Sequence, residues 1–198
     1  MSDKIAEPPK AGNLWQGRRV RLRGIEPGDW AFFHQWNLDS ETARRLYFVP
    51  FPVSAEWQRR WAEHIATADP AGDRFQFVIE TLAGDPVGSI SAQDCDPQHG
   101  TFSFGVAVQQ ERRRHGYAAE AILLLLRYFF RERRYQKVTA HVFSFNTAST
   151  RLHERLGFTL EGRIRRMVYT EGQYFDDLIF GLTAEEFAAR YTDDLAAQ

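Results

Sequence analysis

The stretch Arg113-Arg114-His115-Gly116-Tyr117-Ala118 joins an apolar segment, residues 102–108, to a long run with helical periodicity, residues 119–131. A strand, a short basic loop with a glycine and the start of a helix together form a cradle for an anion. Gly116 lets the backbone turn without a Cβ clash, and the small Ala118 lets a ligand approach the first helical turn. The free N–H groups of that turn and the helix dipole attract phosphate, whose oxygens also suit arginine donors. We therefore predict a phosphate-binding loop at residues 113–118.

Taken alone, this loop also fits an ordinary strand-to-helix turn with a solvated arginine cluster. It lacks the G-x-G-x-x-G pattern of dinucleotide sites and the G-K-[S/T] of a Walker loop. The phosphate-binding interpretation of this loop is strengthened only by a second block of residues further along the chain.

That second block places a polar stripe on a short helix. Residues 137–143 alternate apolar and polar side chains and predict a strand, after which Asn146 or Thr147 caps a helix that Gly157 ends. We expect a buried stripe formed by Ala148, Leu152 and Leu156. The neighbouring stripe is polar and consists of Asn146, Ser149 and His153. It is either a catalytic wall or a helix cap followed by two surface polar residues.

Three motifs in this order resemble the GNAT N-acetyltransferase superfamily. Arg113-x-x-Gly116-x-Ala118 is similar to its Q/R-x-x-G-x-G/A acyl-CoA loop, and Asn146-x-x-Ser149 with Leu156-Gly157-Phe158 and Glu161-Gly162 resembles its N-x-x-[S/A]…GF…EG segment. Residues 169–176 resemble the closing hairpin of the ribosomal-protein alanine acetyltransferase (RimJ/RimL) branch, which also contains spermidine acetyltransferase-like enzymes. The resemblance covers roughly residues 18–187.

The resemblance implies an α+β GNAT fold, a mixed and mostly antiparallel sheet of about seven strands flanked by helices. Strands four and five would splay apart to admit the cofactor. It also implies transfer of acetyl from acetyl-CoA to a primary amine by direct attack in a ternary complex, without a metal. The acceptor would be a protein N-terminal α-amine or a small-molecule amine, with a polyamine or an antibiotic amine as alternatives.

Particular residues take roles from the resemblance. The cofactor would be held by backbone groups of Val106, Ala107 and Val108, by the loop residues Arg113, Arg114, His115, Gly116, Tyr117 and Ala118, and by Asn146. The proton for the departing thiolate would come from His153, at a place where many relatives have tyrosine, or from Ser149.

The general base is left open by the sequence. Relatives often carry glutamate at two strand positions, which here hold Ser103 and Val168. The remaining possibilities are a base acting through water, no dedicated base, or one of the side chains of Asp94, His141 and Glu80. These departures also keep a non-catalytic acyl-CoA-binding or regulatory module as an alternative function.

The acceptor wall is expected in the first third of the chain. It would be built from the aromatic helix carrying Trp30, Phe33 and Trp36 and from residues 47–51, although such aromatics also suit a core. A polyamine acceptor would need acidic residues there, and Asp39 and Glu41 are the only nearby pair.

Composition narrows the class of protein. The 198 residues, 43% of them hydrophobic, fit one domain, expected at 18–190, with tails at 1–17 and 191–198. A net charge of −1 argues against nucleic acid, even through Arg112 to Arg114, and against anionic membrane. The single Cys95 fits an inert thiol in the cytoplasm. A monomer or a homodimer is expected.

The remaining periodicities predict the order of elements. Strands are expected at 19–23, 74–81, 86–92, 100–108, 137–143, 159–169 and 174–182. Two helices, starting at Pro27 and after Ser54, separate the first two strands, and Thr183-x-x-Glu186 begins a terminal helix. Gly105 would mark a bulge in the fourth strand or a site of close packing.

Overall fold

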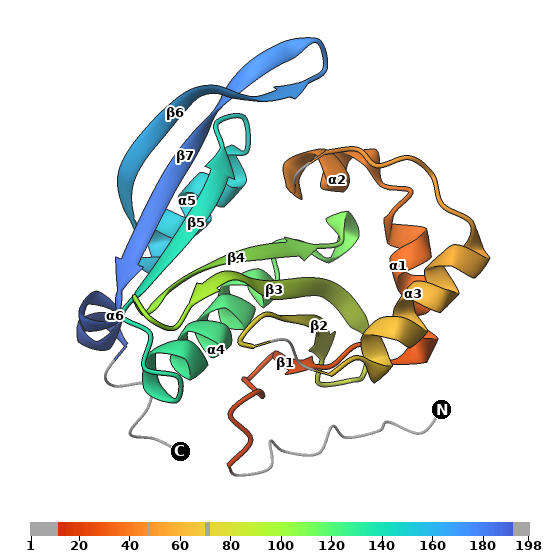
Figure 1. The fold of residues 1–198 in the computed structure, drawn as a ribbon, viewed down its shortest axis with the longest axis horizontal. Coiled ribbons are helices and arrows are strands. Elements are labelled where there is room, and N and C mark those ends of the chain that lie inside the picture. The colour runs from red at the N-terminus through yellow and green to blue at the C-terminus, as the bar shows by residue number, and fades with distance from the viewer. Residues whose placement is uncertain (1–11, 47, 70–71, 192–198) are drawn as a thin grey trace.

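A mixed sheet of seven strands, in the order β1-β2-β3-β4-β5-β7-β6, forms the centre of the molecule (Figure 1). The computed structural model describes residues 12–46, 48–69 and 72–191. The strands are β1 (Val20–Arg23), β2 (Phe75–Thr81), β3 (Pro86–Asp96), β4 (Thr101–Val108), β5 (Lys137–Phe143), β6 (Thr159–Thr170) and β7 (Gln173–Thr183). Neighbouring strands are antiparallel except for the parallel pair β4 and β5. The predicted α+β GNAT architecture is confirmed.

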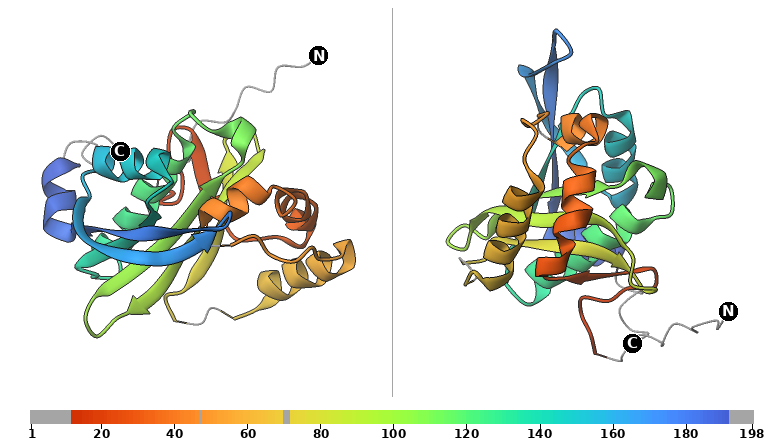
Figure 2. Two further views of the ribbon diagram at one scale, coloured as in Figure 1. Left: turned by 90° about the horizontal axis from the view of Figure 1, so that it is seen from above. Right: turned by 90° about the vertical axis from the view of Figure 1, so that its right-hand side faces the viewer.

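Helices cover both faces of this sheet (Figure 2). They are α1 (Trp30–Trp36), α2 (Ser40–Leu46), α3 (Ala55–Thr67), α4 (Tyr117–Arg131), α5 (Thr147–Leu156) and α6 (Ala184–Arg190), with 3-10 turns at Pro27–Asp29 and Gln110–Arg112. On one face the apolar side of α4 packs on Phe77, Ile79 and Phe102 in the main core. On the other face α1 and α3 pack on Val78 and Ala107. Successive residues of β2 thus pack into cores on opposite faces of the sheet.

Strands β4 and β5 diverge soon after they meet (Figure 1). Their ladder consists of three pairs, from Thr101 with Lys137 to Ser103 with Thr139, although β4 runs on to Val108 and β5 to Phe143. The predicted splay is therefore present, and it opens the sheet over most of the length of both strands.

The strand and helix predictions agree with the structure within a few residues, with one omission. Between β1 and β2 the chain forms α2 in addition to the two expected helices. Asp39 accepts hydrogen bonds from the backbone and hydroxyl of Thr42 and so caps this short helix. Seven residues give too little periodicity for the helix to be recognised.

One local prediction is wrong, and of the two alternatives for Gly105 the structure favours close packing. Ala148 is exposed, and the inward side of α5 is formed by the buried His153 and Leu156 with the half-buried Leu152. Gly105 pairs in register with Ser91, and the irregularity of the β3–β4 ladder lies between Gln93 and Asp96 instead. Gly105 is a packing glycine: a Cβ there would lie 3.3 Å from the Gln93 side-chain nitrogen.

The described part of the expected N-terminal tail is packed. Trp15 stacks at 4.8 Å from Phe77 and 4.6 Å from Tyr128, and Gln16 bridges to Arg21. Residues 1–11 and 192–198, where the remaining tails were expected, lie outside the described residues. Within the described ranges, no helix has the length and apolarity required to cross a lipid bilayer.

Candidate active site

The predicted phosphate-binding loop has the backbone of an anion site. Arg114 and Gly116 both adopt left-handed conformations, with φ of 67° and 81°, and Gly116 is the N-cap of α4. Alternation of left-handed residues points successive N–H groups to one side, and the first turn of the helix adds its own free donors. Arg19 approaches from the bend just before β1, its guanidinium nitrogen 3.4 Å from the position of a Cβ on Gly116. Glycine is required here because a side chain would be strained.

The Arg113 side chain is turned away from this loop. Its guanidinium donates to Val108 O at 3.1 Å and to the Thr42 hydroxyl at 2.6 Å. Desolvation by burial lowers the pKa of Arg113, with Arg45 nearby adding to the effect. The predicted contact of this guanidinium with a phosphate therefore has no support in its placement. His115 also folds back, its Nδ1 2.8 Å from Arg113 O and its ring on Tyr117.

The edge of β4 that faces β5 presents unpaired backbone groups. Gln109 N donates to Val87 O across the β3 edge. Because donors alternate along a strand, the N–H groups of Val106 and Val108 point the other way, toward the opening. Ala107, also predicted to bind cofactor, turns its N–H toward its β3 partner Ser89.

One cavity of about 1090 Å³ passes through the opened sheet. It is lined by consecutive residues of β4, Ser103 to Ala107, and of β5, Ala140 to Phe143. Consecutive strand residues point to opposite faces, so a cavity that touches all of them reaches both faces through the gap. On the α4 and α5 face it meets Asn146, Ser149 and His153. On the other face it meets α1, α2 and a polar floor, which is formed by Gln76, Ser89, Ser91, Gln93, Asp94 and Ser103.

The polar stripe of α5 is assembled as predicted. Asn146 caps the helix by accepting from Ser149 N at 3.3 Å, and Ser149 Oγ lies 3.4 Å from His153 Nδ1. His153 is 3% exposed, between the rings of Phe104, Phe158 and Phe180. Its Nδ1–H donates to Ser149 O at 2.8 Å, and buried Nε2 has no hydrogen-bond partner among the described residues. Burial lowers the pKa of His153, so its imidazole is neutral at pH 7.

Both positions that usually carry the glutamate base line the cavity. Val168 offers no proton acceptor, and Ser103 donates to the exposed Asp94 carboxylate at 2.7 Å. Asp94 itself has a left-handed backbone, φ 46°, at the irregularity of β3. The carboxylate nearest to the strand-four position is therefore contributed by the neighbouring strand.

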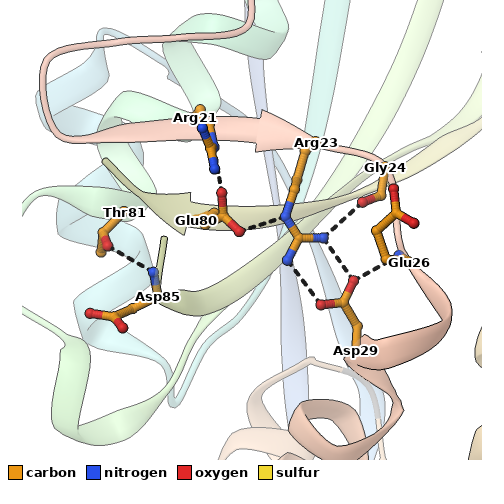
Figure 3. Close-up of polar contacts among 8 residues, drawn as sticks. All are labelled: Arg21, Arg23, Gly24, Glu26, Asp29, Glu80, Thr81 and Asp85. Carbon is orange, nitrogen blue, oxygen red and sulfur yellow. Dashed lines mark hydrogen bonds and ion pairs between the residues drawn. The ribbon is translucent and has the colours of Figure 1, made fainter. Parts of the chain in front are cut away.

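Glu80, another candidate base, is part of a structural ion network (Figure 3). It accepts from the Nε atoms of Arg21 and Arg23, the latter at 2.7 Å, and is 5% exposed. Arg23 also forms a bidentate pair with Asp29, at 2.7 and 2.9 Å. The network ties β1, β2 and the start of α1 together, and Glu80 does not line the cavity.

The third candidate base, His141, lines the cavity together with Asp177 of β7. His141 Nδ1 lies 2.7 Å from Asp177 Oδ2. The sequence offered His141 only as one of several possibilities, because its carboxylate partner is 36 residues away in the chain.

The aromatic region of α1 serves both core and cavity. Phe33 and Trp36 are buried in the α1–α3 core and also line the cavity, whereas Trp30 packs only in that core. From the segment 47–51, Phe48 and Pro50 reach the cavity, and Tyr47 lies outside the described residues. Asp39 and Glu41 do not line the cavity.

Cys95 is placed away from the cavity. Its Sγ lies 3.4 Å from Asp73 O and 3.6 Å from Gln93 O. Burial, reinforced by Asp73, raises the pKa of the thiol. These surroundings disfavour a thiolate nucleophile.

The sheet is thus opened between two parallel strands, with the predicted phosphate-binding loop after β4 and a cavity lined by polar side chains in the gap. Residues 19–159 match the family described as Acetyltransferase (GNAT) domain. The chain therefore belongs to the GNAT acetyltransferase family, and it is an N-acetyltransferase.

Individual relatives support this membership. The SPbeta prophage-derived uncharacterized N-acetyltransferase YokL of Bacillus subtilis is 42% identical over 177 residues, 89% of this chain and 97% of the relative. Spermidine N(1)-acetyltransferase of Vibrio cholerae is 26% identical over 158 residues, 80% of this chain and 89% of the relative. The same fold occurs in the crystal structure of Vibrio cholerae spermidine N-acetyltransferase in complex with CoA and spermine. That structure has a TM-score of 0.75 and 22% identity, covering 86% of this chain and 99% of the other.

Proposed function

We propose that this enzyme transfers acetyl from acetyl-CoA to a primary amine by direct attack in a ternary complex. The observation that carries the proposal is the single cavity through the splayed strands. It reaches both faces of the sheet through the gap, so a donor and an acceptor entering from opposite faces would meet within the sheet. Cys95 lies outside this cavity, which favours a route without an acyl-enzyme.

Acetyl-CoA would supply an activated acetyl thioester. Its pyrophosphate suits the N–H groups of residues 114–118, where left-handed Gly116 leaves room and Arg19 adds charge. Its amide groups suit the N–H groups of Val106 and Val108 on the open edge of β4, as an added strand would. The amide of Asn146 keeps its NH₂ donors free for the same chain, because only its oxygen is used in capping.

Ser149 is the better placed of the two proton donors. Its hydroxyl lines the cavity, whereas the N–H of His153 is directed at Ser149 O and its other nitrogen has no proton in that tautomer. We infer that Ser149 passes a proton to the departing thiolate. His153 would act as a positioning residue that holds the first turn of α5.

The acceptor is proposed to be a small amine with one ammonium group. Asp39 is engaged in capping α2 through Thr42, Glu41 is paired with Arg44 and Arg45, and neither carboxylate of the pair considered for a polyamine lines the cavity. The cavity itself contains one exposed carboxylate, that of Asp94, along with Arg45. Apolar surface from Phe33 and Leu46 suits an alkyl or aryl stem.

A direct test measures thiol release from acetyl-CoA with a panel of amines. The panel contains alkyl and aryl monoamines, amino acids, peptides with free N-termini, spermidine and aminoglycosides. We expect turnover with monoamines at a kcat/KM at least tenfold above that for spermidine. Cofactor binding by calorimetry without turnover on the panel would favour the non-catalytic module. A preference for spermidine would retain the transferase and reject the proposed acceptor class.

The finer assignments rest on single features. The RimJ/RimL-like branch is proposed from the hairpin motif at residues 169–176, and a cytoplasmic location from the solitary cysteine.

A further inference from the structure

A histidine and a buried aspartate form a pair in the opened part of the sheet. His141 lies on β5 two residues beyond Thr139, where the ladder to β4 ends, and Asp177 lies on β7. His141 Nδ1 and Asp177 Oδ2 are 2.7 Å apart, and the two side chains are 51% and 8% exposed. Both residues line the cavity that passes through the sheet.

Strand alternation directs His141 to the acceptor face. Val138, Ala140 and Val142 of β5 are buried in the core with α4, so His141 points to the opposite face. That face carries the polar floor of the cavity, with Ser91 and Ser103 of the neighbouring strands. The imidazole thus stands at the rim of the gap, on the side from which the amine is proposed to enter.

The aspartate fixes the tautomer of the imidazole. A carboxylate accepts from Nδ1–H, which leaves the lone pair on Nε2 and makes that atom the proton acceptor. Nε2 has no bonding partner among the described residues. Asp177 is buried, and its second oxygen has no hydrogen-bond partner in the described part of the chain. A buried carboxylate thus lies directly behind a half-exposed imidazole.

We propose that the His141–Asp177 pair is the general base of the reaction, and this inference rests on the proposed function. Nε2 of His141 takes one proton from the acceptor ammonium, which frees the nitrogen lone pair. The C–N bond then forms and the C–S bond breaks. The nitrogen loses its second proton to solvent, the thiolate takes a proton from Ser149, and Ser149 recovers one from solvent. His141 then returns its proton to solvent, so that the products are the amide, the CoA thiol and one proton.

Other carboxylates fit this role less well. Glu80 is bound to two arginines outside the cavity, and Asp94 already accepts from Ser103. The remaining titratable or charged side chains that line the cavity are those of Arg45, His153 and Tyr169.

The test uses His141→Gln in the full-length enzyme, with the best monoamine of the panel as acceptor. At pH 7 kcat/KM for the amine should fall roughly 10²-fold, whereas the Kd for acetyl-CoA should stay within twofold. Asp177→Asn should give an intermediate loss because it keeps an acceptor oxygen but removes the charge. His64→Gln, on an exposed histidine of α3 outside the cavity, is the matched control and should leave kcat/KM unchanged.

A base has a signature that a structural residue lacks. As pH rises toward the pKa of the amine, solvent deprotonates the acceptor and the deficit of His141→Gln should shrink at least tenfold between pH 7 and 9.5. Acceptors of lower pKa should show a smaller deficit at pH 7. A deficit that is equal at all pH values and for all amines would overturn the base and make His141 structural. A normal rate in His141→Gln, or a larger deficit in Asp94→Asn than in His141→Gln, would also overturn the assignment of His141 as the base.

These outcomes are separable from failure of the proposed function. If the wild-type enzyme acetylates no amine, the transferase proposal falls and the base falls with it. If the wild type turns over and His141→Gln retains its full rate, only the base assignment falls.

Discussion

Arg113 and Thr42 connect the two sides of the cavity, because the guanidinium of one donates to the hydroxyl of the other at 2.6 Å. Arg113 follows β4 in the proposed cofactor loop, and Thr42 is buried in α2 on the side where the acceptor is proposed to enter. The same guanidinium donates to Val108 O at the end of β4. The position of α2, which lines the cavity, thus depends on a residue of the cofactor loop.

Thr42→Val should disturb the acceptor side selectively. The substitution keeps the shape but removes the hydroxyl, so a half-buried guanidinium loses a partner. We expect the KM for the amine to rise roughly tenfold, about 1.4 kcal/mol, with the Kd for acetyl-CoA unchanged within twofold. Thr67→Val is the control, because that hydroxyl bonds only within α3. An equal loss of affinity for both substrates would contradict the link.

Gly116→Val should weaken acetyl-CoA binding at least tenfold, about 1.4 kcal/mol, as measured by calorimetry. A β-branched residue is strained at φ 81° and would crowd Arg19 beside the proposed phosphate site. Gly84→Val is the matched control. Gly84 lies in the turn between β2 and β3, has φ 94°, and has no heavy atom within 4 Å of its Cβ position. Both variants should lose stability, and only Gly116→Val should lose affinity. Unchanged affinity there would reject the loop assignment.

The sequence was sufficient to predict most of the strands and helices because the signals for these elements are local. Helix caps at Ser54 and Thr183, the glycine C-cap at Gly157 and the period of β5 depend on residues close in the chain, and all are present. Helix α2 was missed because seven residues carry little periodicity, and its contact with Arg113 is long-range.

Side-chain direction in the site could not be predicted for the opposite reason. The basic character of Arg113 suggested phosphate, but its direction is set by Thr42, 71 residues away. Asp177 was not predicted as a site residue because its role depends on His141, which lies on the neighbouring strand β5. The burial of His153 depends on three phenylalanines from β4, β6 and β7 or their flanks, whereas its spacing from Asn146 and Ser149 was visible in the sequence.

Cys95→Ser should retain most of the activity. Burial and Asp73 raise the pKa of the thiol, so little thiolate forms at pH 7, and the residue lies outside the cavity. The measurement is kcat/KM at saturating acetyl-CoA, together with mass spectrometry of the enzyme during turnover. Detection of an acetyl group on Cys95 would contradict direct transfer and indicate a ping-pong route.

Stability should fall in mild acid partly because of His153. Burial lowers the pKa of its imidazole in the folded state, so below the unfolded value of about 6.5 the unfolded chain binds more protons. The stabilising contribution is therefore complete above about pH 6.5 and is lost as the pH falls, by at most about 1.4 kcal/mol per pH unit. In denaturant titrations from pH 7 to 5, His153→Phe should show a shallower fall than the wild type. Parallel curves would mean that His153 titrates normally.

The two candidates for the proton donor can be separated by paired substitutions on α5. If Ser149 donates, Ser149→Ala should lower kcat roughly 10²-fold with an unchanged Kd for acetyl-CoA, whereas His153→Phe should cost less than tenfold because the ring still packs against Phe104 and Phe158. Thr150→Ala is the control, since it removes a neighbouring hydroxyl that does not line the cavity.

The reverse order would return the role to His153. In that case His153→Ala should lower kcat by roughly 10²–10⁴-fold, His153→Tyr should restore part of the rate, and Ser149→Ala should have the smaller effect. The buried Nε2 makes this result unexpected, because a donor there would need the other tautomer, and Nδ1–H already donates to Ser149 O. Rates of thiol release in single-turnover experiments, where product release does not interfere, decide between the two orders.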